Sequence, residues 1–455
     1  MYRLGINVGD TYTDGVLMTR EHKIVAAVRE ESAAGELRGI TAAVQSLLKQ
    51  SGCVPEQIAT VVIGTGSGFH AFDQTAPVSV CGIRLTPEPS WLVPLADADS
   101  TVRSCIRLTT LHLTGGHEFD GAPTKGEPSR AEAKKLFEAL SQHPFDAFAV
   151  TSTFSAVNDR HERMVADWLQ ETFGSRVSIT LSHELGGIGF MRRENAALLN
   201  AALVKGMVKR LAGVDELLRE QEIRAKLYLT QNDGSLMSYR YALSYPLLTL
   251  FSGIANSFRG AAFLSGIKDC LVVDVSPTAI HVGKLEGGVP KESRRMSTFA
   301  GVPLNLPVPD LVTLPISAAE QAREAAIEAV YQAVQRFQPR YEPLPVVFVG
   351  IGSERVAALY KDPWAEVIQP AHYDQASAIG CCIAPVSGSV DRMYSLKQMS
   401  RTEAIQLATD QAIKAAIRAG ADPKSVVVQS VEASPLAYVP SQTLRIKAKA
   451  VGRLP

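Results

Sequence analysis

The chain has 455 residues, more than one hydrophobic core usually holds, so its length predicts two or three domains. Lys plus Arg and Asp plus Glu both total 46, and no basic run with interleaved aromatic residues occurs, which argues against a nucleic-acid partner. No stretch approaches the ~18 apolar residues of a membrane span. The sequence opens on a strand pattern rather than a secretory segment, and its six cysteines include no CxxC pair. These features favour a cytoplasmic protein with reduced thiols.

The first segment predicts a strand–turn–strand unit. Alternating apolar residues indicate strands at 2–8, 15–19 and 23–28, with a polar turn between the first two. Apolar residues at helix spacing predict a helix over 36–51. A buried strand at 58–63 then runs into the glycine-rich stretch 64–68.

The middle of the chain alternates between strand and helix patterns. Residues 76–125 are rich in Pro, Gly and Thr and are expected to be mostly β. From residue 130 the pattern predicts helices at 131–140, 162–172 and 193–218 and strands at 147–152 and 177–181. Such alternation is typical of a parallel sheet covered by helices.

A further strand–turn–strand unit is predicted at 225–238, and another at 270–285. A strand at 345–349, a helix at 402–419 and a strand at 443–451 complete the chain. The units at the N-terminus and near Cys270 repeat each other about one lobe apart. This duplication is typical of the α/β actin-like ATPase fold, with two lobes and an interlobe cleft.

The same patterns suggest four regions. We expect an N-terminal lobe at 1–75, a β-rich insertion followed by an α/β segment at 76–225, a second actin-like lobe at 226–390, and a helix with a β tail at 391–455.

The first turn is a candidate phosphate loop. Turns rich in Gly and Thr after a strand can direct backbone N–H groups at phosphate oxygens. The candidate nucleotide-binding residues of this turn are Asn7, Gly9, Thr11 and Thr13, and Asp14 follows them. A carboxylate at such a strand end can hold a hydrated Mg²⁺. The alternative is an ordinary hairpin turn.

The second repeat supplies matching candidates. Asp274 ends its strand, and Thr278 has the corresponding threonine position. Farther along, Gly350, Gly352 and Ser353 form the expected adenosine-side loop. If chemistry takes place here, Asp14 and Asp274 are the first catalytic candidates, and turn capping is the alternative for each.

Several longer motifs resemble the hydantoinase/oxoprolinase family, specifically its shorter members, over nearly the whole chain. The matching motifs are Ser182-His183-Glu184, Arg193-Glu194-Asn195, Phe154-Ser155 with His161-Glu162, Asn232-Asp233-Gly234-Ser235, Ser252-Gly253 with Arg259-Gly260-Ala261, and Ala450-Val451-Gly452. The resemblance implies ATP-dependent opening of cyclic amides such as hydantoins or 5-oxoproline. It also implies a separate partner subunit and an oligomer.

The chain departs from the family pattern where phosphate chemistry takes place. Asn7 replaces the usual Asp and cannot supply the charge that holds Mg²⁺. Asp10 replaces a glycine beside the polyphosphate path. Ser276-Pro277 replaces two glycines, and proline removes a donor. These changes indicate a retained scaffold with a weakened or repurposed ATP and Mg²⁺ site.

Two histidines in the family-like motifs are candidates for a second cluster. His161 and His183, with Glu162, Glu184 or Asp233, have the side chains of a metal or acid–base site, although no i,i+4 ligand spacing occurs and no metal residue is assigned. Asp233 is the third catalytic candidate.

Two functions follow from these residues. The first is a hydrolase, or the activating subunit of one, for cyclic amides. The second is a degenerate family member that binds or regulates a partner subunit.

Overall fold

The computed structural model describes most of the chain. Its described residues are 1–32, 35–65, 76–174, 177–293, 297–321, 323–339, 341–397, 399–436 and 443–455. Most of the glycine-rich stretch predicted at 64–68 lies outside them.

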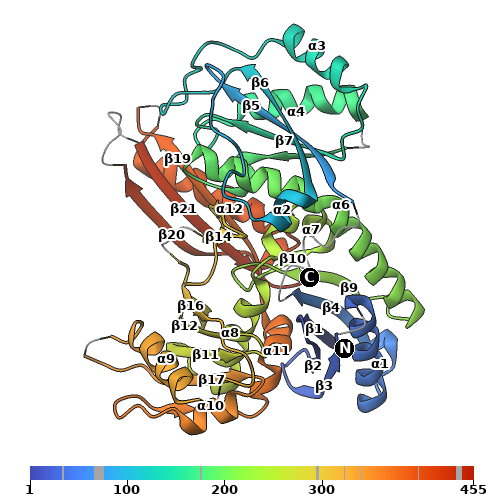
Figure 1. The fold of residues 1–455 in the computed structure, drawn as a ribbon, viewed down its shortest axis with the longest axis vertical. Helices are drawn as coiled ribbons and strands as arrows, with labels where there is room; N and C mark the ends of the chain where they lie inside the picture. Colours follow the sequence, from blue (N-terminus) through green and yellow to red (C-terminus); the bar gives the residue numbers. More distant parts are fainter. Residues whose placement is uncertain are drawn as a thin grey trace.

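Within these residues, a nine-stranded sheet runs through the centre of the molecule (Figure 1). Its order is β20 (Val427–Pro435), β21 (Thr443–Gly452), β19 (Val386–Ser395), β10 (Leu236–Ser238), β9 (Lys226–Thr230), β4 (Ile58–Thr65), β1 (Tyr2–Val8), β2 (Tyr12–Thr19) and β3 (Ile24–Glu31). Strand β1 pairs antiparallel with β2 and parallel with β4. The continuous apolar run of β4 is buried, as expected for a central strand with both faces covered.

A second sheet repeats this pairing at the lower left of Figure 1. It contains β13 (Val289–Pro290), β12 (Ile280–Glu286), β11 (Cys270–Val275), β17 (Val346–Gly350) and β18 (Val367–Ile368), and β16 (Leu311–Leu314) pairs with β12. Strand β11 pairs antiparallel with β12 and parallel with β17, as β1 does with β2 and β4. The duplicated strand–turn–strand unit predicted from the sequence is therefore confirmed.

Two helices lie between these sheets (Figure 1). They are α8 (Ser252–Ser265) and α11 (Ala376–Ile383). A Cβ placed on Gly260 would lie 1.9 Å from the carbonyl oxygen of Ala376, and one on Gly380 would lie 1.9 Å from that of Asn256. Because no side chain fits at these points, the two glycines allow the helix backbones to touch.

A third sheet forms the top of the molecule in Figure 1, with the order β6 (Ile106–Thr114), β5 (Val78–Thr86), β7 (Ala147–Ser152) and β8 (Ser178–Leu181). Its described pairs are all parallel. Helices α3 (Arg130–Leu140) and α4 (Arg160–Phe173) pack apolar side chains on one face, and the 31-residue α6 (Phe190–Glu220) packs on the other. The helix-covered parallel sheet predicted here is confirmed.

The remaining elements connect these layers. They are α1 (Glu36–Ser51), α2 (Ser100–Cys105), α5 (Ser182–Leu185), α7 (Tyr239–Ser244), α9 (Glu324–Gln335), α10 (Ser353–Leu359), α12 (Arg401–Arg418), β14 (Ser297–Phe299) and β15 (Val302–Leu304). Strands β9 and β10 belong to the sheet that contains β1, and the second sheet begins only at β11. The four-region division stays a prediction.

Candidate functional site

The first predicted loop joins β1 to β2, and its polar side chains divide between the two faces of the sheet. Asn7 and Asp14 are cross-strand partners and share one face. The side-chain oxygen Oδ1 of Asn7 accepts a 3.4 Å contact from Nδ2 of Asn256. The same Nδ2 donates to the Thr230 hydroxyl at 2.9 Å. Asn7 is thus held by neighbouring side chains at the end of β1.

The two threonines of this loop lie elsewhere. Thr13 faces α1, where its hydroxyl lies 2.8 Å from that of Ser32. Thr11 is exposed, and its carbonyl oxygen accepts a hydrogen bond from the Ser32 amide. The Gly9 amide donates to Tyr12 O within the turn, at 2.9 Å. The structure therefore separates the Thr13 hydroxyl from the face that holds Asn7 and Asp14.

Asp14 is the carboxylate that connects the two lobes. Its Oδ1 accepts a 2.7 Å hydrogen bond from Arg29 Nε, and Nη1 of Arg29 lies 3.2 Å from Oδ2 of Asp374, just before α11. Ser377 of α11 contacts the other Asp14 oxygen at 3.5 Å. Burial raises the pKa of Asp14 to about 6, although Arg29 acts to lower it.

Asp274 ends β11 on the opposite lobe. Burial raises the pKa of Asp274 to about 7 against a hydrogen bond from Ser257 of α8, and the charge of Asp14 raises it further. The Cβ position of Gly350 would lie 2.5 Å from Oδ1 of Asp274, so the glycine lets the adenosine-side loop approach this carboxylate. The fold thus brings the two predicted carboxylates within electrostatic reach of each other.

The second turn is closed by its own hydrogen bonds. The Ser276 amide donates to Ala279 O at 2.9 Å, and the Ala279 amide donates to Oγ of Ser276 at 3.1 Å. Pro277 has no N–H group. Thr278 is exposed at the tip of the turn. Two of the three amide donors between residues 276 and 279 are therefore bonded inside the turn.

The segment after β16 covers this turn. The Ala318 amide donates to Pro277 O at 2.9 Å, and Nε2 of the buried Gln321 donates to Ser276 O at 2.6 Å. The same side chain places its Oε1 3.1 Å from the Cβ position of Gly352. Gln321 thus fills the space between the second turn and the adenosine-side loop.

The adenosine-side loop has the backbone that its glycines predict. Gly350 and Gly352 have φ values of 87° and 85°, in the region that favours glycine. Ser353 is fully buried, and its Oγ accepts a 3.3 Å hydrogen bond from Gln369. The glycines shape the loop, while the Ser353 hydroxyl already has a protein partner.

These contacts test whether the residues fit a magnesium–triphosphate group. Such a group requires turn amides directed at phosphate oxygens and an uncompensated carboxylate for the metal. Here the amides of Ser276 and Ala279 are already bonded, and Asn7 supplies an amide instead of a charge. Asp14 is paired with Arg29. The bonded amides of the second turn therefore do not fit phosphate oxygens, and of the two predicted carboxylates only Asp274 lacks a basic partner in the described part of the chain.

Asp233 lies in a separate ion pair. Its Oδ2 is 2.6 Å from Nζ of Lys449, and its Oδ1 accepts from both the amide and the hydroxyl of Ser235. Burial opposes the charge, but Lys449 holds the pKa of Asp233 well below its usual range. The carboxylate stabilises the turn between β9 and β10, and a catalytic role for it stays a prediction.

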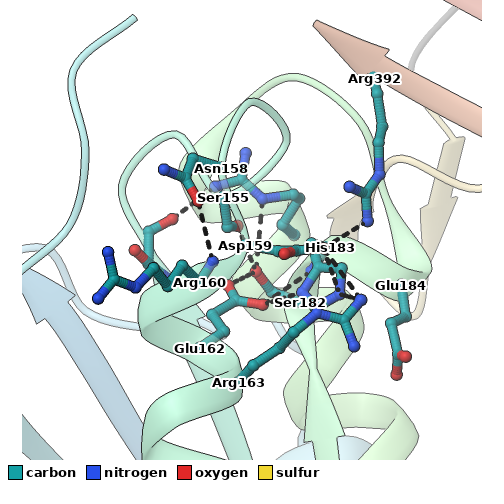
Figure 2. Close-up of polar contacts among 12 residues, drawn as sticks. Ser155, Asn158, Asp159, Arg160, Glu162, Arg163, Ser182, His183, Glu184 and Arg392 are labelled. Carbon is teal, nitrogen blue, oxygen red and sulfur yellow. Dashed lines mark hydrogen bonds and ion pairs between the residues drawn. The ribbon is translucent and has the colours of Figure 1, made fainter. Parts of the chain in front are cut away.

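The motif residues Glu162 and His183 meet in a buried cluster (Figure 2). Oε1 of Glu162 accepts from the Ser152 amide at 2.8 Å and the Ser182 hydroxyl at 2.6 Å. Its Oε2 accepts from the His183 amide at 3.1 Å and lies 2.6 Å from His183 Nδ1. Burial disfavours the charge, yet His183 and Ser182 lower the pKa of Glu162.

Glu162 therefore satisfies the backbone at the ends of β7 and β8. Arg193 completes this role by donating to Ser152 O at 2.8 Å and Gly187 O at 3.1 Å. Because four donors occupy a fully buried carboxylate, Glu162 has no oxygen left for a substrate. Of the two alternatives for this motif, the contacts favour a structural role over acid–base chemistry.

Asp159 extends the cluster to the central sheet. Its Oδ2 lies 3.3 Å from Nε2 of His183, 3.0 Å from Arg163 and 2.8 Å from Arg392 of β19. The Met393 amide also donates to Ala156 O at 3.1 Å. Figure 2 shows Arg392 reaching this cluster from a separate strand. These contacts fasten the third sheet to the central one.

The other candidates of this group do not join it. Oε2 of Glu184 accepts from the hydroxyl of Tyr245 at 2.8 Å. His161 stacks on His117 with ring centroids 4.0 Å apart, and its Nδ1 accepts from the Gly116 amide. Among the described residues, no group of three or more His, Cys, Asp or Glu side chains is arranged to hold a metal ion.

Sequence reasoning missed Arg29, Gln321, Asp159 and Arg392. None of these residues lies in a glycine-rich turn or is one of the named residues of the family-like motifs. Each becomes important only through a partner far away in the chain, as Arg29 does with Asp374. In the part of the chain that the structure describes, no helix is long and apolar enough to cross a membrane.

The duplicated units on either side of α8 and α11 define a two-lobed α/β protein of the actin-like class. Two family models match the sequence: the hydantoinase/oxoprolinase N-terminal region at residues 3–173 and hydantoinase/oxoprolinase at residues 193–341. The chain belongs to the hydantoinase/oxoprolinase family. A search of curated proteins finds no match.

Solved structures share the fold at low sequence identity. The ATP-dependent caprolactamase from Pseudomonas jessenii has a TM-score of 0.76 and 14% identity, covering 100% of this chain and 88% of that one. A nucleotide-free acetone carboxylase has a TM-score of 0.68 with the same identity and coverage. At this identity the likeness establishes the fold.

Proposed function

We propose that this chain takes part in cyclic-amide processing together with a partner subunit, and that it does not turn over ATP itself. Family membership supports the substrate class, and the name of the similar caprolactamase agrees with a cyclic amide. The observation that carries the proposal is the closed second turn, in which Ser276 and Ala279 bond each other and Gln321 bonds the Ser276 carbonyl.

We infer a partner subunit because the second turn of this chain leaves nucleotide binding to another protein. A chain whose second phosphate turn is closed by its own hydrogen bonds does not bind a nucleotide and its metal at that turn. Its lobes are nevertheless fixed to each other by Arg29 with Asp14 and Asp374, and by the glycine crossing of α8 and α11. We infer a scaffolding or regulatory subunit of an oligomer in the cytoplasm.

A second candidate is a hydrolase that works without ATP. Asp14 and Asp274 favour it, because their pKa values of about 6 and about 7 suit proton transfer near neutral pH. In this version Asp274, the more weakly acidic carboxyl, would give a proton to the ring nitrogen, and Asp14 would accept one from water.

Calorimetric titration of the purified chain with ATP and Mg²⁺ tests the first proposal. We expect no binding by the native chain, and binding after Asn7→Asp, Asp10→Gly, Ser276→Gly, Pro277→Gly and Gln321→Ala are combined. Micromolar binding by the native chain would refute the closed-turn argument.

Ring opening separates the two candidates. Hydantoin, 5-oxoproline and caprolactam are incubated with the chain alone and followed by NMR. No turnover is expected of a partner-dependent subunit. Turnover that is lost in Asp274→Asn would favour the ATP-independent hydrolase instead.

A further inference from the structure

A cavity of about 440 Å³ lies where the third sheet's domain meets the central sheet. It is lined by the start of α6, by Leu92 after β5, by Asn305 after β15 and by Arg445 of β21. None of these residues belongs to the interlobe turns or to the Glu162 cluster. Four separate parts of the chain therefore build one concave surface, which adjoins the Glu162 cluster at Arg193 without sharing a residue with it.

The charged side chains of this cavity are both arginines. Arg445 donates two hydrogen bonds to Asp391, at 2.8 and 2.6 Å, and is therefore largely compensated. Within the part of the chain that the structure describes, the exposed Arg192 contacts the neutral Asn305 at a long 3.5 Å. The described lining of the cavity includes no acidic side chain. The cavity consequently has one guanidinium group whose charge no carboxylate of the lining offsets.

The lining also includes apolar side chains, and part of it is held in place by Arg84. Phe190, Leu92 and Met191 contribute to it. The guanidinium carbon of Arg84 lies 6.0 Å from the centre of the Phe190 ring, and Arg84 also donates to Leu92 O at 2.6 Å. Arg84 is fixed in turn by a buried ion pair with Glu194. A preorganised apolar wall of this kind lowers the entropy cost of binding.

Glycines determine the shape of the segment that leads into the cavity. A Cβ on Gly187 would lie 2.4 Å from an oxygen of Asp391, so only glycine lets this segment approach β19. Gly189 has a φ of 104° and begins α6 without a side-chain cap. The partial positive charge of that helix start adds to the charge of Arg192.

We propose that this cavity binds a small organic carboxylate with an apolar body and no ammonium group. The carboxylate pairs with Arg192, since a guanidinium group matches two carboxylate oxygens. The apolar body lies against Phe190 and Leu92. An ammonium group is disfavoured because the charged side chains of the lining are arginines and the nearby Asp391 is already paired with Arg445.

A preference for this ligand class would let the cavity distinguish among ring-opened products. This inference rests on the proposed function. Water adds across the ring amide, placing OH on the carbonyl carbon and H on the nitrogen as the C–N bond breaks. A lactam then yields an amine beside its carboxylate. A hydantoin yields a carboxylate with a neutral carbamoyl group, which suits the cavity.

Four probes test the binding, three phenyl compounds of similar size and one small inorganic anion. They are 3-phenylpropionate, its neutral amide 3-phenylpropionamide, the zwitterion phenylalanine, and inorganic phosphate, each titrated by calorimetry into the full chain. We expect measurable binding of 3-phenylpropionate and at least tenfold weaker binding of the other three. Equal binding of the amide, or stronger binding of phosphate, would overturn the proposed class, as would absence of 3-phenylpropionate binding.

Variants then locate the site. Arg192→Gln should weaken 3-phenylpropionate by about tenfold or more, since a charge-assisted hydrogen bond is lost. Arg219→Gln, at the exposed far end of α6, is the matched control and should leave the affinity unchanged. Phe190→Leu keeps an apolar wall but reduces its area, and should weaken binding by a smaller factor. An unchanged affinity in Arg192→Gln would refute the site.

The test is independent of catalysis. Binding of 3-phenylpropionate with no ring opening would leave the cavity intact and contradict only the second candidate function. Comparing N-carbamoylphenylalanine with phenylalanine then examines the link to hydantoins. Equal affinities for these two would overturn the selection against an ammonium group.

Discussion

The side-chain amide of Gln321 donates a 2.6 Å hydrogen bond to the backbone carbonyl of Ser276. This contact joins the segment after β16 to the turn that would otherwise face a phosphate group. Because Gln321 also approaches Gly352, one residue connects the two loops of the second lobe.

Gln321→Ala should destabilise the chain by about 1–2 kcal/mol, because it removes a buried hydrogen bond and leaves a small void. Thermal unfolding measures the change. Gln406→Ala, which removes only a surface contact with Asp410, is the control and should be nearly neutral. An unaltered Tm in Gln321→Ala would show that the segment is not held by this contact.

Asp274→Asn should stabilise the protein at pH 8 and have its smallest effect near or below pH 4, where the carboxyl is mostly neutral in both the folded and the unfolded chain. The folded pKa of Asp274 is about 7 against an ordinary value of 3.8, so the native chain loses stability as the pH rises from about 4 through 7. The asparagine stays neutral throughout. We expect a gain of about 3–4 kcal/mol at pH 8, because a pKa shift of about three units corresponds to roughly 1.4 kcal/mol for each unit. Asp215→Asn, at a half-exposed position on α6, is the surface control, and a loss of stability at pH 8 in Asp274→Asn would contradict the shift.

Glu162→Gln should cost about 3–5 kcal/mol, since it removes one partner of a buried charge network and leaves donors unpaired. Urea denaturation is the measurement. The neighbouring Glu184→Gln should change stability by no more than about 0.5 kcal/mol, because Glu184 is exposed. Wild-type stability in Glu162→Gln would argue that the carboxylate serves chemistry rather than structure.

Gly260→Ala should destabilise the α8–α11 crossing by about 3 kcal/mol, because its methyl group would overlap the Ala376 carbonyl. Gly213→Ala in α6 is the matched control. There the new methyl meets only the flexible end of Leu37, and the helix gains propensity. Equal effects of the two changes would contradict the close crossing.

Asp159 and Arg392 should be coupled by about 1 kcal/mol in a double-mutant cycle, because both are mostly shielded from solvent. Asp159→Asn and Arg392→Gln supply the single variants. The exposed pair Lys134 and Glu138 gives the comparison and should show weaker coupling. Additive effects at Asp159 and Arg392 would contradict a stabilising contact between the third sheet and the central sheet.

The sequence determined the local elements of this protein. The helix predicted over 36–51 and the strand at 2–8 occur with those bounds, and the unit predicted at 270–285 corresponds to β11 and β12, because apolar periodicity is a property of neighbouring residues. The repeated strand–turn–strand pattern likewise predicted the duplicated lobes. The substitutions at Asn7 and Ser276-Pro277 already indicated a changed phosphate site.

Only the tertiary structure decided what those residues contact. Arg29 bonds both Asp14 and Asp374, and Gln321 covers Ser276, through pairs separated by up to 345 positions. The carboxylate oxygens of Glu162 accept hydrogen bonds from Ser152 at the end of β7 and from His183 just after β8, and these strand ends come together only in the folded chain. Burial and hydrogen-bond saturation depend on such distant partners, so residue type and spacing leave the chemistry open until packing assigns each donor and acceptor.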